Sequence, residues 1–318
     1  MNLITKTALA ALLATTAHAE TITFAWTPNP QTPQVDVALA NGYFEDAGLD
    51  IELVAFRTGR EGFEAMIGGQ VDITFMAEFP AAVGALTGQD FAVVGDLARF
   101  TGSRVIVSTD AGEIATPEDL AGKRIGTTIG TNVNFYLDEV LSEAGVEAEI
   151  VGAAPPDLVP ALARGDLDGV VPFPSFYAAA ATTLGDRYGE LRVPGYEVHY
   201  ILAASPDMAS DRAEALNAFM AALAKADADV ADDPAGAMEA VSASMQGAVS
   251  TDALETMWQD VEIGLTLGTG LAELLVDEAA WILDQGVVRG EPVSREQMLS
   301  FFAPEALETA APEAVSLP

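Results

Sequence analysis

The stretch ITFAWTPNPQTPQVDVALANGYFEDAGLDIELV, residues Ile22–Val54, reads as a strand, a turn, a helix and a second strand in direct succession. Ile22, Phe24 and Trp26 are apolar with small or β-branched residues between them, which is typical of a parallel strand covered on both faces. The prolines that follow cannot continue the strand, because each removes a ladder donor and fixes φ. The stretch therefore predicts a βαβ unit and an α/β fold.

The turn Pro28–Gln34 leads into a helix that we expect to begin at Pro33, with Thr32 as its N-cap, and to end at Asn41-Gly42. Open α/β sheets bind ligands at turns between the carboxyl end of a strand and a helix N-terminus, because free amide N–H groups point into the crevice there. We therefore expect this turn to face a ligand, with an ordinary surface turn as the alternative.

Residues 1–19 read MNLITKTALAALLATTAHA, with one lysine near the start, an apolar stretch from Ala8 to about Ala17, and Ala-His-Ala before Glu20. This pattern is typical of a secretory signal peptide, which we expect to be cleaved after Ala19. The apolar run is about half the length that spans a bilayer, so we expect no retained anchor. These features predict an exported protein in the periplasm, with full secretion as the alternative.

Composition excludes several classes of function. The chain carries 14 Lys and Arg against 48 Asp and Glu, a formal net charge of −34 that becomes −35 when Lys6 leaves with the predicted signal peptide. Such a surface repels nucleic acid and anionic lipid, so we expect neither as a partner. The chain has no cysteine, which excludes disulfides, thiolate metal sites and thiol nucleophiles. After cleavage His199 is the only histidine, which excludes multi-histidine metal sites and disfavours a Ser-His-Asp hydrolase. We also expect no cofactor.

Short strands and helices alternate up to about Ala204, which predicts parallel sheets with right-handed crossovers. The rhythm restarts after an expected strand at Arg104–Ser108, which indicates two similar α/β units. Beyond Ser205-Pro206 we expect alanine-rich helices without a strand, packed on the first unit, and a loose tail over 303–318.

The expected chain path leaves the first unit near Arg104–Ser108 and returns near Tyr200–Ser205. These two strand-like crossings would form a hinge beside a cleft. The predicted division is a first lobe from residues 20–105 and 205–318 and a second lobe from residues 106–204.

Several short motifs occur in order along the chain: W-T-P-N at Trp26–Asn29, A-x-x-x-G-Y-F-x-x-A-G-L-D-I-E at Ala38–Glu52, F-x-x-G at Phe56–Gly59, G-G-Q-V-D-I at Gly68–Ile73, T-P-E-D-L-A-G-K-R-I-G at Thr116–Gly126, A-L-x-x-G-D-L-D-G at Ala161–Gly169 and W-x-x-x-x-G at Trp281–Gly286. In this order and spacing the chain resembles the periplasmic solute-binding proteins of nitrate/sulfonate/taurine-type ABC importers, a group that also includes thiamine-pyrimidine-binding members.

The resemblance implies a two-lobed periplasmic-binding-protein-like fold of type II, with a parallel-core sheet in each lobe, a two-strand hinge, and C-terminal helices packed on the first lobe. It also implies that ligand binding closes the lobes and that the closed form docks on a membrane permease without any covalent chemistry. We expect a monomer.

Arginines and a helix start are the expected anion contacts. Arg57 and Arg60 flank Gly59, and in so acidic a chain their clustering favours bidentate recognition of an oxyanion. Arg60 has an alternative as an exposed partner of Glu64 at i+4. The Gly130-Thr131-Asn132 segment opens a helix whose amides can receive an anionic head group, with a plain N-cap as the alternative.

Glu78 departs from the small hydroxyl residues that sulfonate binders carry at its turn. It therefore disfavours a simple anion such as nitrate and suits a zwitterionic ligand, with an N-cap or a salt bridge to Arg57 or Arg99 as the alternative. His199 lies on the expected return crossing, where it contacts the ligand or serves the hinge or core. The full set of expected ligand contacts is Trp26, Asn29, Gln31, Arg57, Thr58, Glu78, Phe79, Gly130, Thr131, Asn132, Phe173, Ser175, Tyr196 and His199.

These features predict the binding component of an importer for a sulfonate-like or zwitterionic solute. A pyrimidine or thiamine-precursor heterocycle is the alternative ligand, because Trp26–Asn29 resembles the opening motif of that branch. The histidine that usually follows there is replaced by Gln31, Thr32 or Pro33, which weakens this alternative. An enzyme of the same fold is disfavoured by the missing cysteines, and the effector lobe of a transcription regulator by the charge.

Overall fold

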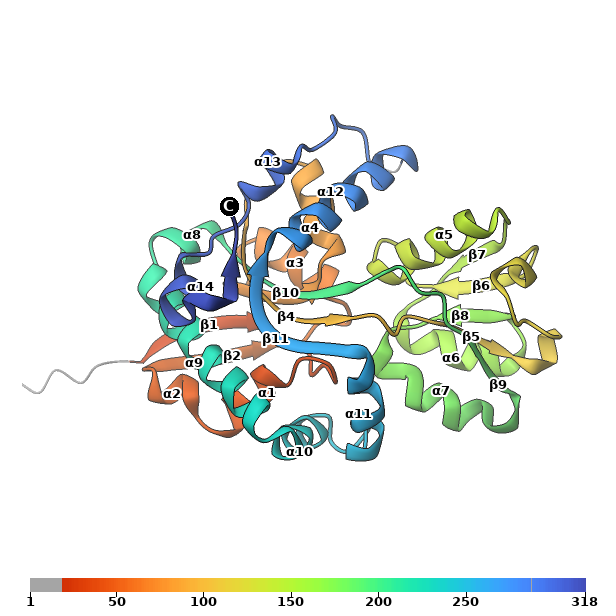
Figure 1. The fold of residues 1–318 in the computed structure, drawn as a ribbon, viewed down its shortest axis with the longest axis horizontal. Coiled ribbons are helices and arrows are strands. Elements are labelled where there is room, and N and C mark those ends of the chain that lie inside the picture. The colour runs from red at the N-terminus through yellow and green to blue at the C-terminus, as the bar shows by residue number, and fades with distance from the viewer. Residues whose placement is uncertain (1–18, 287) are drawn as a thin grey trace, which may run out of the picture.

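The computed structural model describes residues 19–286 and 288–318 and builds them around two separate β-sheets (Figure 1). The predicted signal peptide lies outside the described residues, apart from its last residue Ala19. We call the part of the chain around the seven-stranded sheet the larger lobe and the part around the five-stranded sheet the smaller lobe.

The larger sheet has the strand order β12-β11-β4-β10-β3-β1-β2. β1 pairs in parallel with β2 and β3, as the βαβ pattern predicts, whereas β10 runs antiparallel between β3 and β4. Its strands are β1 (Glu20–Ala25), β2 (Leu49–Val54), β3 (Ile73–Ala77), β4 (Ala92–Phe100), β10 (Val198–Ala204), β11 (Val261–Gly268) and β12 (Val315–Ser316).

The smaller sheet has the order β7-β6-β8-β5-β9. β6 is parallel to β7 and β8, and β5 is antiparallel to β8 and β9. Its strands are β5 (Val105–Ser108), β6 (Arg124–Thr127), β7 (Glu149–Gly152), β8 (Gly169–Val171) and β9 (Tyr188–Leu191).

Helices cover both sheets. Those of the larger lobe are α1 (Pro33–Ala40), α2 (Tyr43–Asp46), α3 (Gly59–Ile67), α4 (Phe79–Leu86), α8 (Pro206–Ser210), α9 (Ala213–Asp232), α10 (Pro234–Ser244), α11 (Thr251–Met257), α12 (Thr269–Asp284), α13 (Arg295–Leu299) and α14 (Glu305–Ala310). Those of the smaller lobe are α5 (Asn132–Ala144), α6 (Pro155–Arg164) and α7 (Tyr177–Leu184). Among the described residues, none of these helices combines the length and apolar character needed to cross a membrane.

Local chemistry explains the first βαβ unit. Pro33 occupies the first turn of α1 and Asn41 caps its end, as predicted, and Gly42 follows with φ 70°, which glycine adopts without a steric penalty. Gly59, at the start of α3, approaches β3 so closely that an added Cβ would lie 2.6 Å from the Cβ of Met76. This close approach fixes the position of the turn before α3 against the sheet.

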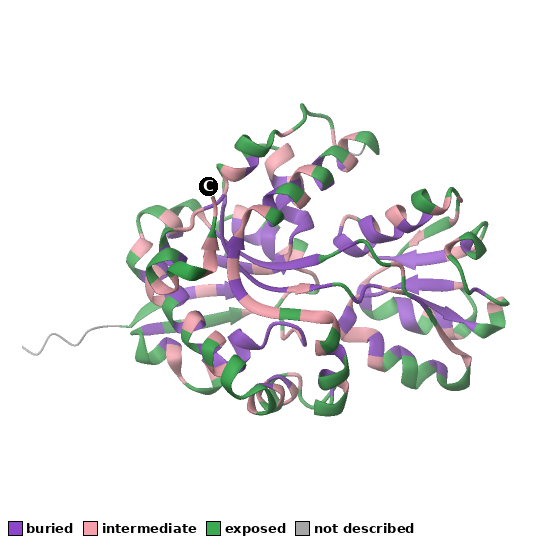
Figure 2. Ribbon diagram, in the orientation of Figure 1, coloured by how far each residue is buried: buried purple, intermediate pink, exposed green. Residues whose placement is uncertain are grey.

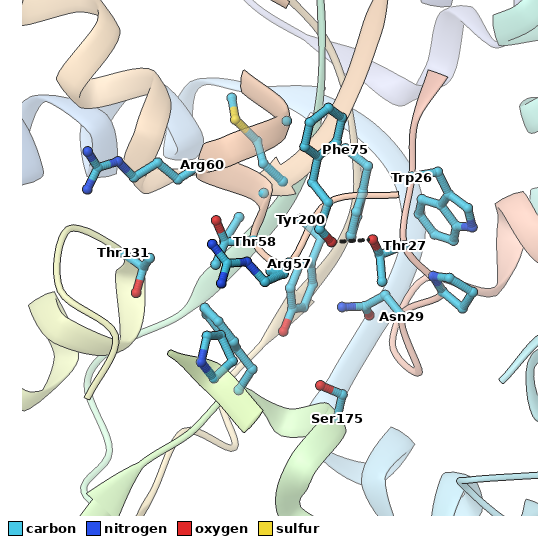
Figure 3. A pocket seen from close by; sticks show the side chains of 18 of the residues that line it. Trp26, Thr27, Asn29, Arg57, Thr58, Arg60, Phe75, Thr131, Ser175 and Tyr200 are labelled. Atoms are coloured by element: carbon cyan, nitrogen blue, oxygen red, sulfur yellow. Dashed lines mark hydrogen bonds between the residues drawn. The ribbon is translucent and has the colours of Figure 1, made fainter. Parts of the chain in front are cut away.

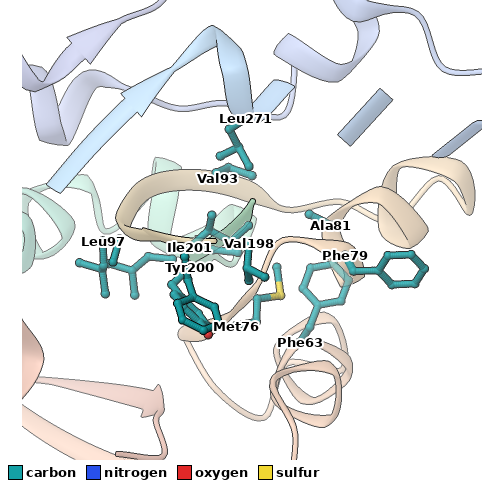
Figure 4. Close-up of a cluster of buried hydrophobic side chains, with 14 of the residues drawn as sticks. Phe63, Met76, Phe79, Ala81, Val93, Leu97, Val198, Tyr200, Ile201 and Leu271 are labelled. Atoms are coloured by element: carbon teal, nitrogen blue, oxygen red, sulfur yellow. The ribbon is translucent and has the colours of Figure 1, made fainter. Parts of the chain in front are cut away.

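The core of the larger lobe lies beneath β4 and β10, where Val93, Leu97, Ile201 and Met76 meet the helices (Figure 4). Buried residues follow the inner strands of both sheets, whereas the edge strands β2 and β7 are largely exposed or half-buried (Figure 2). Full burial of each large aliphatic or aromatic side chain contributes about 1.5–3 kcal/mol relative to exposure. The C-terminal part joins this core through Phe219 of α9, whose ring packs on that of Phe24.

The expectation that only helices follow Ser205-Pro206 is wrong. β11 pairs antiparallel with β4, and β12 pairs in parallel with β11. β9 in the smaller lobe is a further strand that the sequence did not indicate. The sequence signal for β11 is an alternation of apolar residues with period two at Val261, Ile263, Leu265 and Leu267.

The loose tail expected over 303–318 is also wrong. α14 packs against α9 with Leu307 fully buried, and Val315 pairs with Leu267 in the sheet. A composition of Pro, Ala and Glu suggested disorder, but the buried side chains of Ala306 and Leu307 and the pairing of β12 with β11 dock this segment. Composition cannot report such contacts, because they depend on the surface that α9 and β11 present.

The two crossings between the lobes lie at residues 101–104 and 192–197, between β4 and β5 and between β9 and β10. The return crossing therefore precedes the expected position, because residues 200–204 form the inner strand β10 of the larger sheet. The predicted lobe boundaries themselves stay predictions.

Candidate functional site

A cavity of about 430 Å³ lies between the lobes, at the carboxyl ends of the parallel strands (Figure 3). The larger lobe contributes the turn after β1, the turn after β2, the end of β3 and Tyr200 of β10. The smaller lobe contributes the start of α5, the start of α6 and the segment Phe173–Phe176. Most of these segments are turns that the sequence reading predicted at the cleft, whereas the start of α6 was not predicted.

Many of the predicted ligand contacts line this cavity. They are Trp26, Asn29, Arg57, Thr58, Thr131, Asn132, Phe173 and Ser175. They come from both lobes, which shows that the turns after β1, β2 and β6 do converge as expected. A role in binding stays a prediction for each of these residues.

The remaining predicted contacts lie outside the lining of this cavity. Gln31 is fully buried in the turn, and its side-chain amide atoms have no hydrogen-bond partner among the described residues. Its backbone N–H donates to Asn29 Oδ1 at 2.8 Å, so the asparagine carbonyl is held by the turn while its NH₂ group is directed at the cavity (Figure 3). Phe79 and Gly130 line a second cavity, which is described below.

Glu78, Tyr196 and His199 form a buried cluster rather than a ligand contact. The Tyr196 hydroxyl hydrogen-bonds to Glu78 and lies 3.4 Å from Glu278, while the His199 backbone N–H donates to Glu78 at 2.9 Å. His199 Nδ1 lies 2.7 Å from Asp96. The sequence did not indicate this burial of Glu78 and Tyr196, because Glu278 of α12 has no local signal, whereas a core role for His199 was one of the two alternatives left open.

Burial raises the pKa of both Glu78 and Glu278, since the charged form loses its hydration. The negative charge of Glu78 raises the pKa of Glu278 further, so Glu278 is the carboxyl that retains a proton. Burial lowers the pKa of His199, but the hydrogen bond and negative charge of Asp96 outweigh it and leave this pKa raised. The cluster thus binds Tyr196, on the crossing between the lobes, to the core of the larger lobe.

Replacing Tyr196 with phenylalanine should destabilise the protein by about 1–3 kcal/mol, because two buried carboxyl groups would lose their shared hydroxyl. Denaturant unfolding measures this change. Tyr188→Phe is the matched control, since its hydroxyl bonds to the partly exposed Glu190, and it should cost less than half as much. Equal losses in the two variants would contradict this account of the cluster.

Among the described residues that line the cavity, the charged side chains are Arg57 and Arg60. Arg57 is 72% exposed and pairs with Glu61 at 3.0 Å, and Arg60 is 49% exposed and pairs with Glu64 at 2.8 Å. Exposed pairs of this kind contribute about 0.2–1 kcal/mol, so an incoming anion can compete for either guanidinium. The cavity therefore offers positive charge and no carboxylate.

The smaller lobe faces these arginines with the N-terminus of α5. Thr131 is the N-cap, but its hydroxyl donates to the Thr128 carbonyl at 2.7 Å instead of capping the helix. The backbone N–H groups of Asn132 and Val133 have no acceptor among the described residues. A helix N-terminus with free amides attracts an anion.

Aromatic side chains form much of the remaining wall. Trp26 packs edge-on against Phe75 with ring centroids 4.6 Å apart, and Phe75 stacks on Tyr200 at 6.0 Å. Burial raises the pKa of Tyr200 well above its ordinary value, so the hydroxyl stays protonated and can donate. Such walls suit a ligand with an apolar or planar body.

Sequence reasoning missed several lining residues. Phe56 and Phe75 are adjacent to predicted turns, and Tyr200 lies on β10 one residue from His199, so position along the strand was the available signal. Met245, just after α10, lines the cavity as well. No pattern in the sequence indicates Met245, because the position of α10 depends on its packing against α1, α9 and α11.

A family model described as NMT1/THI5 like matches residues 29–237, about two thirds of the chain. The chain belongs to the NMT1/THI5 like family. This member is 30% identical over 169 residues to the taurine-binding periplasmic protein of Escherichia coli (strain K12). The match covers 52% of the chain and 52% of that protein, so the chain spans about half the length of the curated relative it matches.

Solved structures share the fold of this NMT1/THI5 like chain. The alkanesulfonate-binding protein SsuA from Xanthomonas axonopodis pv. citri, bound to MOPS, has a TM-score of 0.71 and 18% identity, with 89% of this chain and 97% of that chain covered. A mutant of DSZB in complex with biphenyl-2-sulfinic acid has a TM-score of 0.69 and 17% identity, with 93% and 99% covered. The two-lobed periplasmic-binding-protein-like fold and the resemblance to sulfonate- and taurine-type proteins are confirmed.

Proposed function

We propose that this chain is the solute-binding component of an ABC importer, and that it captures a small organic sulfonate-like compound between its lobes and delivers it to a membrane permease. The observation that carries this proposal is the cavity of about 430 Å³ with guanidinium groups on one wall and free helix amides on the other. The taurine-binding relative and the sulfonate-binding SsuA support it.

A sulfonate group fits these donors because it presents three oxygens in a compact, permanently ionised head. Arg57 belongs to the larger lobe and the amides of Asn132 and Val133 to the smaller lobe, so one head group would bond to both. Binding would then stabilise the closed arrangement of the lobes by the difference in affinity between closed and open forms. Residues 101–104 and 192–197 are where we place the hinge.

The zwitterionic version of this solute loses its main support. Its ammonium group was assigned to Glu78, and Glu78 is fully buried against Tyr196 and the His199 backbone instead. A cation would have to rest on the aromatic walls alone. An acidic head with a neutral body therefore matches the lining better than a zwitterion does.

A pyrimidine-like heterocycle remains the second candidate ligand, and the aromatic wall formed by Trp26, Phe75 and Tyr200 favours it. Flat rings can stack on these side chains, with Asn29 and Ser175 as hydrogen-bonding groups. A neutral heterocycle would not form an ion pair with Arg57 or Arg60, so this candidate ranks second.

We also propose that the protein is not an enzyme, although DSZB, of similar fold, is described as a desulfurization enzyme. The chain has no cysteine, and the described lining residues include no histidine, aspartate or glutamate. The described lining therefore holds no thiol, imidazole or carboxyl group for catalysis, and its tyrosine, Tyr200, stays protonated. The periplasm, a monomeric state and docking on a permease complete the proposal.

A thermal-shift panel tests the ligand class. Saturating short alkanesulfonates such as ethanesulfonate, at about 100 times Kd, should add about 2.7 kcal/mol and raise the melting temperature by about 5 °C, whereas the zwitterion taurine at the same concentration should give a smaller shift. Sulfate serves as the control for unspecific anion binding. If pyrimidines raise the melting temperature and sulfonates leave it unchanged, the heterocycle is the ligand; if neither class shifts it, the proposed solute classes fail.

A further inference from the structure

A second cavity, of about 390 Å³, lies beside the first one between α3, α4, α12 and the loop that precedes α5. Like the first cavity it has walls from both lobes, since Ile129 and Gly130 belong to the smaller lobe and Trp281 to α12 of the larger lobe. The head-group site proposed above uses none of this space.

Apolar side chains dominate the lining of this second cavity. Phe63, Ile67, Phe79, Val83 and Trp281 form its wall. Ile129 stands at its edge with 51% of its surface exposed, one of the large apolar side chains that the fold leaves open. Concave apolar surface of this size stabilises a bound apolar group by releasing its hydration water.

Arg60 separates the two cavities, since Arg60 and Pro80 line both. The guanidinium lies against the backbone of Gly130, where an added Cβ would come 2.5 Å from Arg60 Nη1, and Gly130 has φ +76°. The only ion pair of Arg60 in the described structure is the half-exposed one to Glu64. A contact this weak lets the side chain swing aside, so the partition can open.

Charge distinguishes the two spaces. The charged lining residues are Arg57 and Arg60 for the first cavity, whereas Glu64 joins Arg60 at the second. A second anionic group would meet the Glu64 carboxylate there, and a second cation would lose its hydration to an apolar wall. The second cavity therefore suits an uncharged apolar occupant.

We propose that the second cavity receives the apolar tail of the solute whose anionic head binds in the first, so that the ligand is an amphiphile that passes beside Arg60. This inference rests on the proposed function, which concerns the anionic head group of the ligand. It adds that the rest of the ligand is an uncharged apolar chain. Both lobes would contact the tail, so the tail would stabilise the closed arrangement of the lobes in addition to the head group.

Calorimetric titration of unbranched alkanesulfonates from two to eight carbons tests the proposal on the full-length mature protein. Each methylene that enters the second cavity should raise the affinity about three- to fourfold, until the space is filled. Affinity that does not change with chain length overturns the proposal.

Two variants locate the effect. Val83→Trp fills the second cavity and should remove the gain with chain length while leaving ethanesulfonate binding within about twofold of the parent. Ile129→Asp, at a half-exposed position, should lower the affinity of octanesulfonate at least tenfold through charge at the edge. Ile150→Asp, at a comparably exposed site outside both cavities, is the matched control and should change neither affinity. A chain-length gain that survives both variants overturns the proposal.

Fluorescence separates the tail site from the head-group site. A neutral alcohol with a terminal bromine, 6-bromohexan-1-ol, should quench Trp281, and the quenching should vanish in Trp281→Phe and in Val83→Trp. If no sulfonate binds at any length but this quenching persists, the proposed head group is wrong and the apolar site stands. If the bromoalcohol leaves Trp281 unquenched while sulfonates bind, the head-group proposal stands and this inference is overturned.

Discussion

Replacing Arg57 with methionine is expected to weaken sulfonate binding about 10- to 100-fold. Methionine preserves much of the length of the side chain but removes the guanidinium, and a hydrogen bond to a charged group contributes about 1.5–3 kcal/mol. The loss should fall toward the lower end of this range, because Arg57 is 72% exposed and its charge is screened by solvent. Calorimetry with the sulfonate that gives the largest thermal shift measures the change.

Arg164→Met is the matched control for this prediction. Arg164 is a similarly exposed arginine, paired with Asp166 at 2.8 Å, and it lies on α6 outside the cavity lining. Its removal changes the net charge by the same amount, so any effect of overall charge on anion affinity appears in both variants. Equal affinities for the two variants would show that the Arg57 guanidinium does not contact the ligand.

Asp36→Asn should stabilise the protein at pH 8, by at most about 4 kcal/mol. Asp36 lies on α1, is 3% exposed, and faces the side on which α10 packs. Burial raises the pKa of Asp36 from its ordinary value of 3.8 to about 7, although Ser244 of α10 opposes the rise. The folded protein therefore holds a proton that the unfolded chain releases at lower pH.

The sign of the pH dependence follows from this raised pKa. The contribution of Asp36 is fully present below its unfolded pKa near 4 and is lost as the pH rises through the folded value of about 7. Asparagine stays neutral throughout. The free energy of unfolding of the variant should therefore exceed that of the parent by an amount that grows from pH 4 to pH 8, and the two should be equal near pH 4. Denaturant unfolding at both pH values measures it.

Asp50→Asn is the control for Asp36→Asn, since Asp50 is an exposed carboxylate on β2. It should change the free energy of unfolding by less than 0.5 kcal/mol at either pH. A gain for Asp36→Asn that is the same at pH 4 and pH 8 would contradict protonation of the buried carboxyl as its cause.

Local pattern in the sequence was sufficient for most elements up to Ala204 and for several turns that line the cleft, but not for β9, β11, β12 or α14. The turn at Thr27–Pro30 and the start of α1 at Pro33 follow from backbone chemistry, which acts between neighbours and can be deduced from a single chain, although the Thr32 side chain makes no capping hydrogen bond. The free start of α5 at Thr131 belongs to the same class. These turns were therefore placed correctly at the carboxyl ends of their strands before any packing was known.

The local sequence pattern could not predict the direction in which a side chain at the end of a strand points. Glu78 follows β3 directly and was expected in the cleft, yet it turns into the core because Tyr196, from the interlobe crossing, and Glu278, from α12, meet it there. Those partners are 118 and 200 positions further along the chain. No local pattern reports a partner at that distance.

The sequence by itself determined that this protein is an acidic, cysteine-free α/β chain with two sheet units, and it predicted arginines and a helix start as donors to an anionic head group. Only the tertiary structure decided that β11 and the C-terminal segment close the larger sheet, that Glu78 is core, and that Arg60 divides two cavities. The physical reason is range: caps, turns and periodicity act within a few residues, whereas burial and cavity walls are set by elements that meet only after the whole chain has folded.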